Sequence, residues 1–312
     1  MELEYNPEVG RELGWDLARF GWNPRDDANH DVKEGHKAGL AHFVRAQRNP
    51  DRFERKWLQL RQNALRRGRV VQPEVTPDFI KFIDHPDCPV TTVHMTHGLM
   101  EETDWSIDRV NNDGAYAEGN LIVISTRANK AKAGKSFEEV FRIASEISEQ
   151  ETIEGLNRRE WGRLASIMVG ACASPDDEAA MEFPLLTRVP RGSVACDFQL
   201  LQWLLYRATH KAAIRAQLVK RLNRFQPEKS KALLLDVAAD RLSSLVKTVD
   251  YMFDASLDTR FMSLLVKWHL AIPDSKRHGY VRLLGRIDNA EVLGNDMLAK
   301  WSLETKGYFA DT

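Results

Sequence analysis

Hydrophobic and polar residues alternate with a period of two in one short stretch of the chain, Trp105–Val110, and this pattern is typical of a half-buried strand. The polar, glycine-containing residues 111–119 that follow predict a loop. The apolar run 120–124 predicts a second strand that returns against the first. The pattern therefore predicts two strands joined by a loop.

A short helix is predicted directly after these strands. Ser125 or Thr126 offers an N-cap oxygen, residues 127–133 continue the helix, and Gly134 can end it. Strand, loop, strand and helix together make a ββα unit.

Amphipathic helices are predicted on both sides of this unit. Residues 51–68 carry apolar side chains at helical spacing and end at a glycine. Thr76 followed by Pro77 is typical of the start of another helix. Residues 136–147 begin with a capping box and have one apolar face.

Beyond residue 151 the periodicity is helical over most of the chain. Long helical patterns cover 198–225, 227–253 and 257–270, and residues 273–279 predict a loop. Near the N-terminus the signal is weaker, an apolar cluster that contains Trp15, Leu17, Phe20 and Trp22.

These patterns predict an α+β fold that is mostly helical and has three parts. The parts are a helical N-terminal segment with a basic helix at 1–72, a ββα domain at 73–150 and a helical C-terminal domain at 151–312. Apolar residues make up 43% of the chain and charged residues 29%, as in soluble globular proteins.

The net charge of −1 excludes a globally basic nucleic-acid binder, so any such surface has to be local. No apolar run approaches the roughly eighteen residues of a membrane helix. The three cysteines are far apart in the sequence, which fits a reducing cytosol. We therefore expect a cytoplasmic protein with no membrane partner.

Positive charge is concentrated in and beside the helix predicted at 51–68. The residues that carry it are Arg45, Arg48, Arg52, Arg55, Lys56, Arg61, Arg66, Arg67 and Arg69. One interpretation is a solvated basic face. Because the helix directly precedes the ββα unit, the other interpretation is contact with nucleic-acid phosphates through Arg61, Arg66 and Arg67.

The amino-acid sequence of the ββα unit contains motifs that resemble those of a known family. The chain reads Ser106-Ile107-Asp108-Arg109-Val110, then Tyr116, Gly119-Asn120 and Arg127-Ala128-Asn129-Lys130-Ala131-Lys132. This resembles the S-I-D-R variant of the HNH endonucleases, over about residues 55–147. Upstream, Cys88 begins a turn like the C-x-x-T-G of many members, with Thr92 in place of the glycine. The resemblance implies a ββα-metal fold that hydrolyses phosphodiester bonds, with DNA as the expected substrate.

The resemblance also assigns roles to individual residues. It implies that Asp108 and Asn129 carry the metal ion, and Mg²⁺, or Mn²⁺ in its place, prefers such oxygen ligands. Asn120 stands where a side-chain amide ties the loop to the site, and Lys132 where a contact with nucleic acid is expected.

Arg109 departs from the ordinary HNH pattern, which has a histidine here as the general base. Arginine stays protonated and cannot take a proton from water, but it can clamp a phosphate oxygen and stabilise transition-state charge. The base must then be His94 or His97, Tyr116, or hydroxide on the metal ion. Of the two histidines we favour His97, which stands next to a glycine and nearer the first strand.

Zinc is a further hypothesis, because His85, Cys88, His94 and His97 are zinc-type ligands in two pairs. The spacing between the pairs is tight, and the segment between them predicts a turn and a strand. We therefore do not expect structural zinc and favour a buried Cys88, with one histidine facing the catalytic cleft.

The sequence thus predicts a metal-dependent endonuclease acting in phage biology, defence or mobile-element movement. Two other classes stay open. One is a nucleic-acid-binding module of the same fold that lacks hydrolysis, and the other is a regulatory protein that acts through the C-terminal domain. Because one ββα unit cuts one strand, a homodimer or a protein partner held by that domain is also open.

Overall fold

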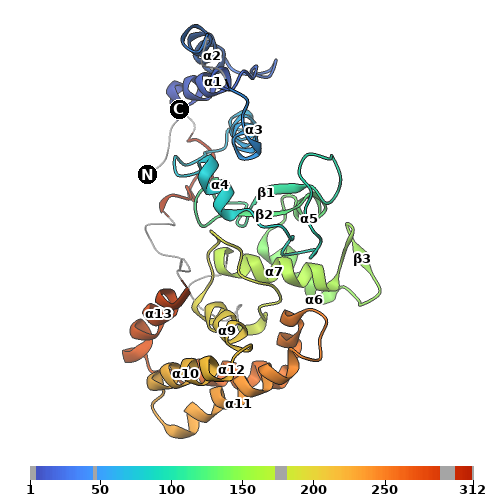
Figure 1. Ribbon diagram of the computed structural model, residues 1–312, viewed down its shortest axis with the longest axis vertical. Coiled ribbons are helices and arrows are strands. Elements are labelled where there is room, and N and C mark those ends of the chain that lie inside the picture. Colours follow the sequence, from blue (N-terminus) through green and yellow to red (C-terminus); the bar gives the residue numbers. More distant parts are fainter. Residues whose placement is uncertain (1–4, 45–47, 173–180, 289–298, 311–312) are drawn as a thin grey trace. The chain divides into compact units, whose positions relative to one another are not determined.

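The computed structural model describes residues 5–44, 48–172, 181–288 and 299–310 (Figure 1). Their fold is α+β and mostly helical, which confirms the predicted class, and their strands form two two-stranded sheets. Contacts within the chain divide it into two units. The first unit comprises Met1–His85, Ile107–Val123 and Gly294–Thr312, and the second Pro86–Ser106 and Ile124–Leu293.

The division runs through both strands of the predicted ββα unit. Strand β1 (Trp105–Arg109) and strand β2 (Leu121–Ser125) pair with each other, and each contributes residues to both units. Helix α5 (Thr126–Lys132) follows and belongs to the second unit. The predicted boundaries after residues 72 and 150 do not coincide with this division.

Helices α1 (Pro7–Arg19), α2 (His30–His42), α3 (Arg52–Arg66) and α4 (Pro77–Ile83) belong to the first unit. The last two begin as predicted. Asp51 and Glu54 form a capping box for α3, and Thr76 caps α4 with Pro77 in its first turn. The predicted N-terminal apolar cluster is a small core of Leu13, Leu17, Phe20, Val32 and Leu58. Trp22 packs against this core, whereas Trp15 is exposed.

Helices α1 and α2 lie side by side at very short range (Figure 1). A Cβ atom built on Gly14 would lie 2.0 Å from the carbonyl oxygen of Val32, and one on Gly35 would lie 2.0 Å from that of Arg11. Such separations are far below van der Waals contact, so glycine is required at both positions.

The first half of the second unit continues from α5. It contains α6 (Phe137–Glu146), the antiparallel pair β3 (Thr152–Ile153) and β4 (Leu156–Asn157), and α7 (Arg158–Cys172). Helix α6 has the predicted capping box, formed by Ser136 and Glu139. The short β3–β4 hairpin was not predicted.

The second half of this unit is a helical bundle with its own core. Its elements are α9 (Asp197–Ala208), α10 (Ala212–Leu222), η1 (Asn223–Phe225), α11 (Lys229–Leu245), η2 (Met252–Leu257), α12 (Thr259–Leu270) and α13 (Asp274–Asp288). Phe198, Tyr206, Phe261 and Trp268 are fully buried in this core. Among the described residues, no helix combines the length and apolar character that a bilayer crossing needs.

Three predictions for this half are corrected. The helix predicted over 227–253 ends at Leu245 of α11. The pattern over 198–225 is broken between α9 and α10 rather than continuous. The loop predicted at 273–279 is wrong, because these residues lie mainly in the first turns of α13. Tyr280 and Leu284 of that helix are fully buried, and their burial outweighs the weak helix propensity of Gly279.

We expect that Gly14→Ala destabilises the α1–α2 pair by about 2 kcal/mol or more, because the added methyl group meets backbone atoms that cannot move aside. Native-state hydrogen exchange of the α1 and α2 amides, together with urea unfolding, measures the loss. The matched control is Gly134→Ala, where a Cβ atom would meet nothing within 4 Å. Equal stability of the two variants would contradict this close approach.

Candidate functional site

The loop between β1 and β2 is closed by the side chain of Asn120, which is completely buried. Its Nδ2 donates to the carbonyl oxygens of Asn111 at 3.0 Å and Ala115 at 2.9 Å. Its Oδ1 accepts from the backbone N–H of Asn111 at 2.7 Å. The amide therefore ties both ends of residues 111–115 to the start of β2.

The guanidinium of Arg109 braces the same loop. Its Nη1 donates to the carbonyl oxygens of Asn112 at 2.9 Å and Gly114 at 2.8 Å. Its Cζ lies 5.1 Å from the ring centroid of Tyr116, within cation–π range. These hydrogen bonds hold the guanidinium in place beside the loop.

The C-terminal segment, residues 299–310, packs against this loop in the first unit. Trp301 is fully buried, its carbonyl oxygen accepts from the N–H of Ala115 at 2.6 Å, and its Nε1 donates to the carbonyl of Glu118 at 2.9 Å. The sequence analysis missed this segment. Its only sequence feature is one tryptophan, Trp301, which is far from the loop along the chain. A contact over such a distance leaves no local pattern in the sequence.

The segment after α3 lies between the loop and the C-terminal segment. On one side, Val70 accepts from the N–H of Tyr116 at 3.0 Å. On the other side, the N–H of Val70 donates to the carbonyl of Gly307 at 2.9 Å. A Cβ atom on Gly307 would lie 2.6 Å from backbone atoms of Gly114, so only glycine allows this approach. The segment after α3 and the C-terminal segment thus both support the loop.

In the second unit, Asn129 on α5 has its amide nitrogen engaged. Nδ2 donates to Oγ of Ser106 at 2.6 Å, which leaves the carbonyl oxygen Oδ1 as the atom that can bind a cation. The helix is anchored by an ion pair between Arg127 and the buried Glu160 of α7. The hydrogen bond to Ser106 therefore fixes the side chain of Asn129, and the ion pair of Arg127 fixes the helix that carries it.

The turn that leads into β1 is organised by Asp104. Its carboxylate accepts from Oγ1 of Thr96 at 2.7 Å and from the N–H groups of Leu99 and Met100. Burial alone would raise the pKa of Asp104, but these hydrogen bonds outweigh it and hold the pKa below its usual range. Its carbonyl oxygen accepts from the N–H of Thr126 at 2.7 Å, so the turn is fixed to the start of α5.

The histidines upstream differ in their surroundings. His97 is partly buried, and its ring centroid lies 5.0 Å from that of Trp105 at the start of β1. His94 is exposed, and its Nδ1 lies 3.1 Å from a carboxylate oxygen of Asp87. Cys88 is buried, as we favoured, and its Sγ accepts from the N–H of Ser125 at 3.2 Å.

Within the described ranges, one group of three His, Cys, Asp or Glu side chains has its ligand atoms within 4.8 Å of one another, and it consists of His30, Asp31 and Glu34. Two of these residues are exposed, and such groups are common on helix surfaces without an ion. The zinc hypothesis for His85, Cys88, His94 and His97 gains no support from these distances.

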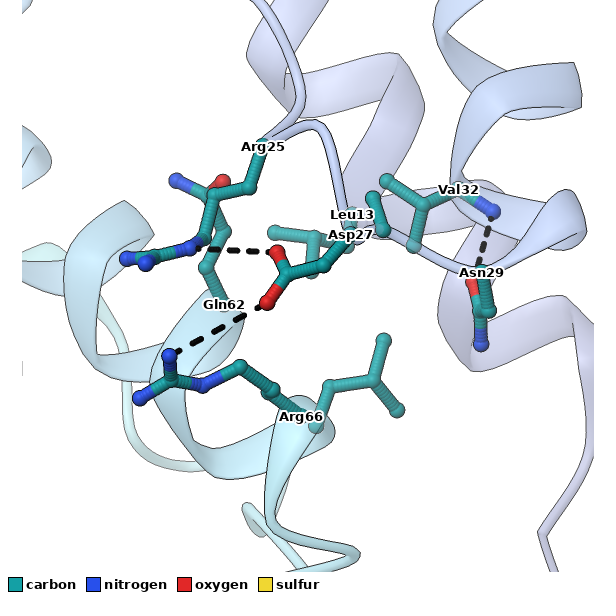
Figure 2. Close-up of a pocket in the computed structure, with 9 residues that line it drawn as sticks. Leu13, Arg25, Asp27, Asn29, Val32, Gln62 and Arg66 are labelled. Atoms are coloured by element: carbon teal, nitrogen blue, oxygen red, sulfur yellow. Dashed lines mark hydrogen bonds and ion pairs between the residues drawn. The ribbon is translucent and has the colours of Figure 1, made fainter.

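The basic residues predicted to bind nucleic acid have distinct partners. Arg61 forms an ion pair with Asp16 and lies over the ring of Trp57. Arg66 lines a cavity of about 210 Å³, where Asp27 lies between Arg66 and Arg25 (Figure 2).

Arg67 differs from both, because it is exposed and donates from Nη2 to the hydroxyl of Tyr116 at 2.8 Å. The side chain of Lys132 is fully buried, so a contact between its ammonium group and nucleic acid would need a rearrangement.

The two predicted metal ligands lie in different units, Asp108 in the first and Asn129 in the second. A carboxylate and an amide carbonyl are the oxygen ligands that Mg²⁺ and Mn²⁺ accept, so the donor chemistry fits the predicted ion. Their meeting over one ion stays a prediction.

Comparison of the chain with protein-family models, with curated proteins and with solved structures gives no match in any of the three.

We expect that Asn120→Asp opens the loop. The two carbonyl oxygens lose their donors and face a buried carboxylate, which costs on the order of 3 kcal/mol. Faster hydrogen exchange at the amides of Ala115 and Tyr116 would report the opening. Asn63→Asp on α3, whose side chain forms no hydrogen bond within the described ranges, is the isosteric control, and equal exchange in both variants would refute the role given to Asn120.

Proposed function

We propose that the chain is a metal-dependent endonuclease of the HNH type that hydrolyses phosphodiester bonds in DNA. The observation that carries the proposal is the hydrogen bond from Asn129 Nδ2 to Ser106 Oγ. It joins two residues of the S-I-D-R and R-A-N motifs and orients the amide so that its oxygen is presented to a cation.

Each residue then has a chemical role. Asp108 and Asn129 would hold Mg²⁺ or Mn²⁺, which when bound offsets the charge that develops on the scissile phosphate and the leaving oxygen. His97 accepts the proton of the attacking water, because neutral imidazole is a base near neutral pH. Arg109 supplies positive charge to the phosphate, and Asn120 keeps closed the loop whose carbonyl groups position Arg109.

Asp108→Ala should reduce nicking of supercoiled plasmid to background in the presence of Mg²⁺, a loss on the order of a thousandfold, because the only carboxylate of the S-I-D-R strand is removed. Agarose gels with Mg²⁺, with Mn²⁺ and with EDTA measure the loss. Asp113→Ala, which removes an exposed carboxylate from the loop that follows this strand, should cut at the wild-type rate. Wild-type nicking by the Asp108 variant would remove the site assignment.

A second candidate is a nucleic-acid-binding module that lacks hydrolysis. The observation that favours it is the engagement of Arg109 Nη1 with two loop carbonyls. A side chain with a bracing role explains an arginine at this position without any catalytic need.

Arg109→His separates the two candidates. If Arg109 stabilises the transition state, Arg109→Lys and Arg109→His should both lose on the order of a hundredfold in rate, since neither supplies the planar fork. The pH dependence of the remaining rate should keep its wild-type shape. The rate is measured by plasmid nicking from about pH 5.5 to pH 9, and hydrogen exchange of the Tyr116 amide checks that the loop stays closed. A histidine variant that is faster than wild type, with a new titration near neutrality, would favour the second candidate.

A further inference from the structure

The guanidinium groups of Arg67, Arg69 and Arg109 lie near Tyr116 and the carbonyl group of Asn112 in the first unit. Arg67 at the end of α3 donates to the phenolic oxygen at 2.8 Å, and Cζ of Arg109 lies 5.1 Å from the ring centroid. Arg69 and Arg109 both direct Nη1 at the carbonyl oxygen of Asn112, at 3.5 and 2.9 Å. The three side chains therefore converge on one place.

The contacts of Arg67 and Arg69 are with neutral groups. Arg69 donates to the carbonyl of Lys306, and its Cζ lies 3.5 Å from the ring centroid of Tyr308. Within the described ranges, neither Arg67 nor Arg69 forms an ion pair with a carboxylate. Their positive charges are therefore fixed in position but not neutralised.

This arrangement has an electrostatic cost. Burial lowers the pKa of Arg69, and the charges of Arg109 and Arg67 lower it further. An anion placed among the three groups would turn this repulsion into attraction and would accept charge-assisted hydrogen bonds. A phosphate group matches the guanidinium fork best, because two of its oxygens can accept in parallel.

We propose that Arg67, Arg69 and Arg109 around Tyr116 form a binding site for a backbone phosphate of the nucleic-acid substrate. The proposal rests on the proposed function for its ligand, and it adds Arg69, which the sequence analysis did not assign to the site. The site is preorganised, because Tyr308 and the carbonyl of Lys306 hold Arg69 before the ligand arrives.

The three arginines predicted from the sequence on α3 are thus not equivalent. Arg61 and Arg66 have the carboxylates of Asp16 and Asp27 as partners, whereas Arg67 donates to the hydroxyl of Tyr116. Arg66 and Arg67 are both exposed and adjacent in sequence, so they form a matched pair for an experiment.

The test is binding of a fluorescein-labelled 20-base-pair DNA duplex to the full-length chain in EDTA, followed by anisotropy over a series of NaCl concentrations. Arg67→Gln and Arg69→Gln should each weaken binding and lower the slope of log affinity against log salt by about one, as the loss of one phosphate contact does. Arg67→Lys should keep the wild-type slope, because an ammonium group still contacts a phosphate. Arg66→Gln should also keep it.

Unchanged slopes for Arg67→Gln and Arg69→Gln would overturn the proposal. Should Arg69→Gln fail to fold, the salt slope of Arg67→Gln alone tests the proposal, because Arg67 is exposed. A parallel titration with inorganic pyrophosphate identifies the source of the phosphate. Arg67-dependent binding of pyrophosphate without binding of DNA would overturn the nucleic-acid assignment.

The EDTA condition separates this proposal from the nuclease proposal. A protein that binds DNA through Arg67 and Arg69 but does not nick it with Mg²⁺ would support the phosphate site and contradict hydrolysis. Nicking that Arg67→Gln and Arg69→Gln leave unchanged, with unchanged salt slopes, would support hydrolysis and contradict the phosphate site.

Discussion

The buried amide of Asn120 is the constraint on which the candidate site depends. Its three hydrogen bonds close the loop between β1 and β2 without help from any regular element. The carbonyl groups that receive Arg109 exist in that arrangement only while the loop is closed. A buried amide that satisfies both its donors and its acceptor is rigid, because every alternative position leaves polar groups unpaired.

Local signals made much of the fold predictable. The strands around the loop, the capping box of α6 and the Thr76 cap of α4 all depend on residues a few positions apart, and the structure has them. The close approach of α1 and α2 was not predicted, because it depends on which carbonyl faces Gly14 across the helix pair. Helix α13 was missed for a related reason, since its stability comes from a distant core.

Some features of the candidate site could also be predicted from the sequence, and others could not. The motif residues could be named from the sequence because their spacing is local, but their partners could not. Asp16, the partner of Arg61, lies 45 positions from it along the chain. A run of arginines therefore reads as one uniform basic face, although Arg61 and Arg66 have carboxylate partners and Arg67 has a phenol. The distribution of carboxylates, not the count of arginines, decides where positive charge is available.

The contact between Trp301 and the loop has a consequence for how the protein is made. Trp301 and Gly307 support residues 114–118, yet they are synthesised about 190 residues later, after the whole helical bundle. On the ribosome, the loop therefore emerges long before the segment that braces it, and the arginine cluster lacks its Tyr308 support until then. A nascent chain would carry the residues of the site without its finished geometry until residues 301–308 have also emerged.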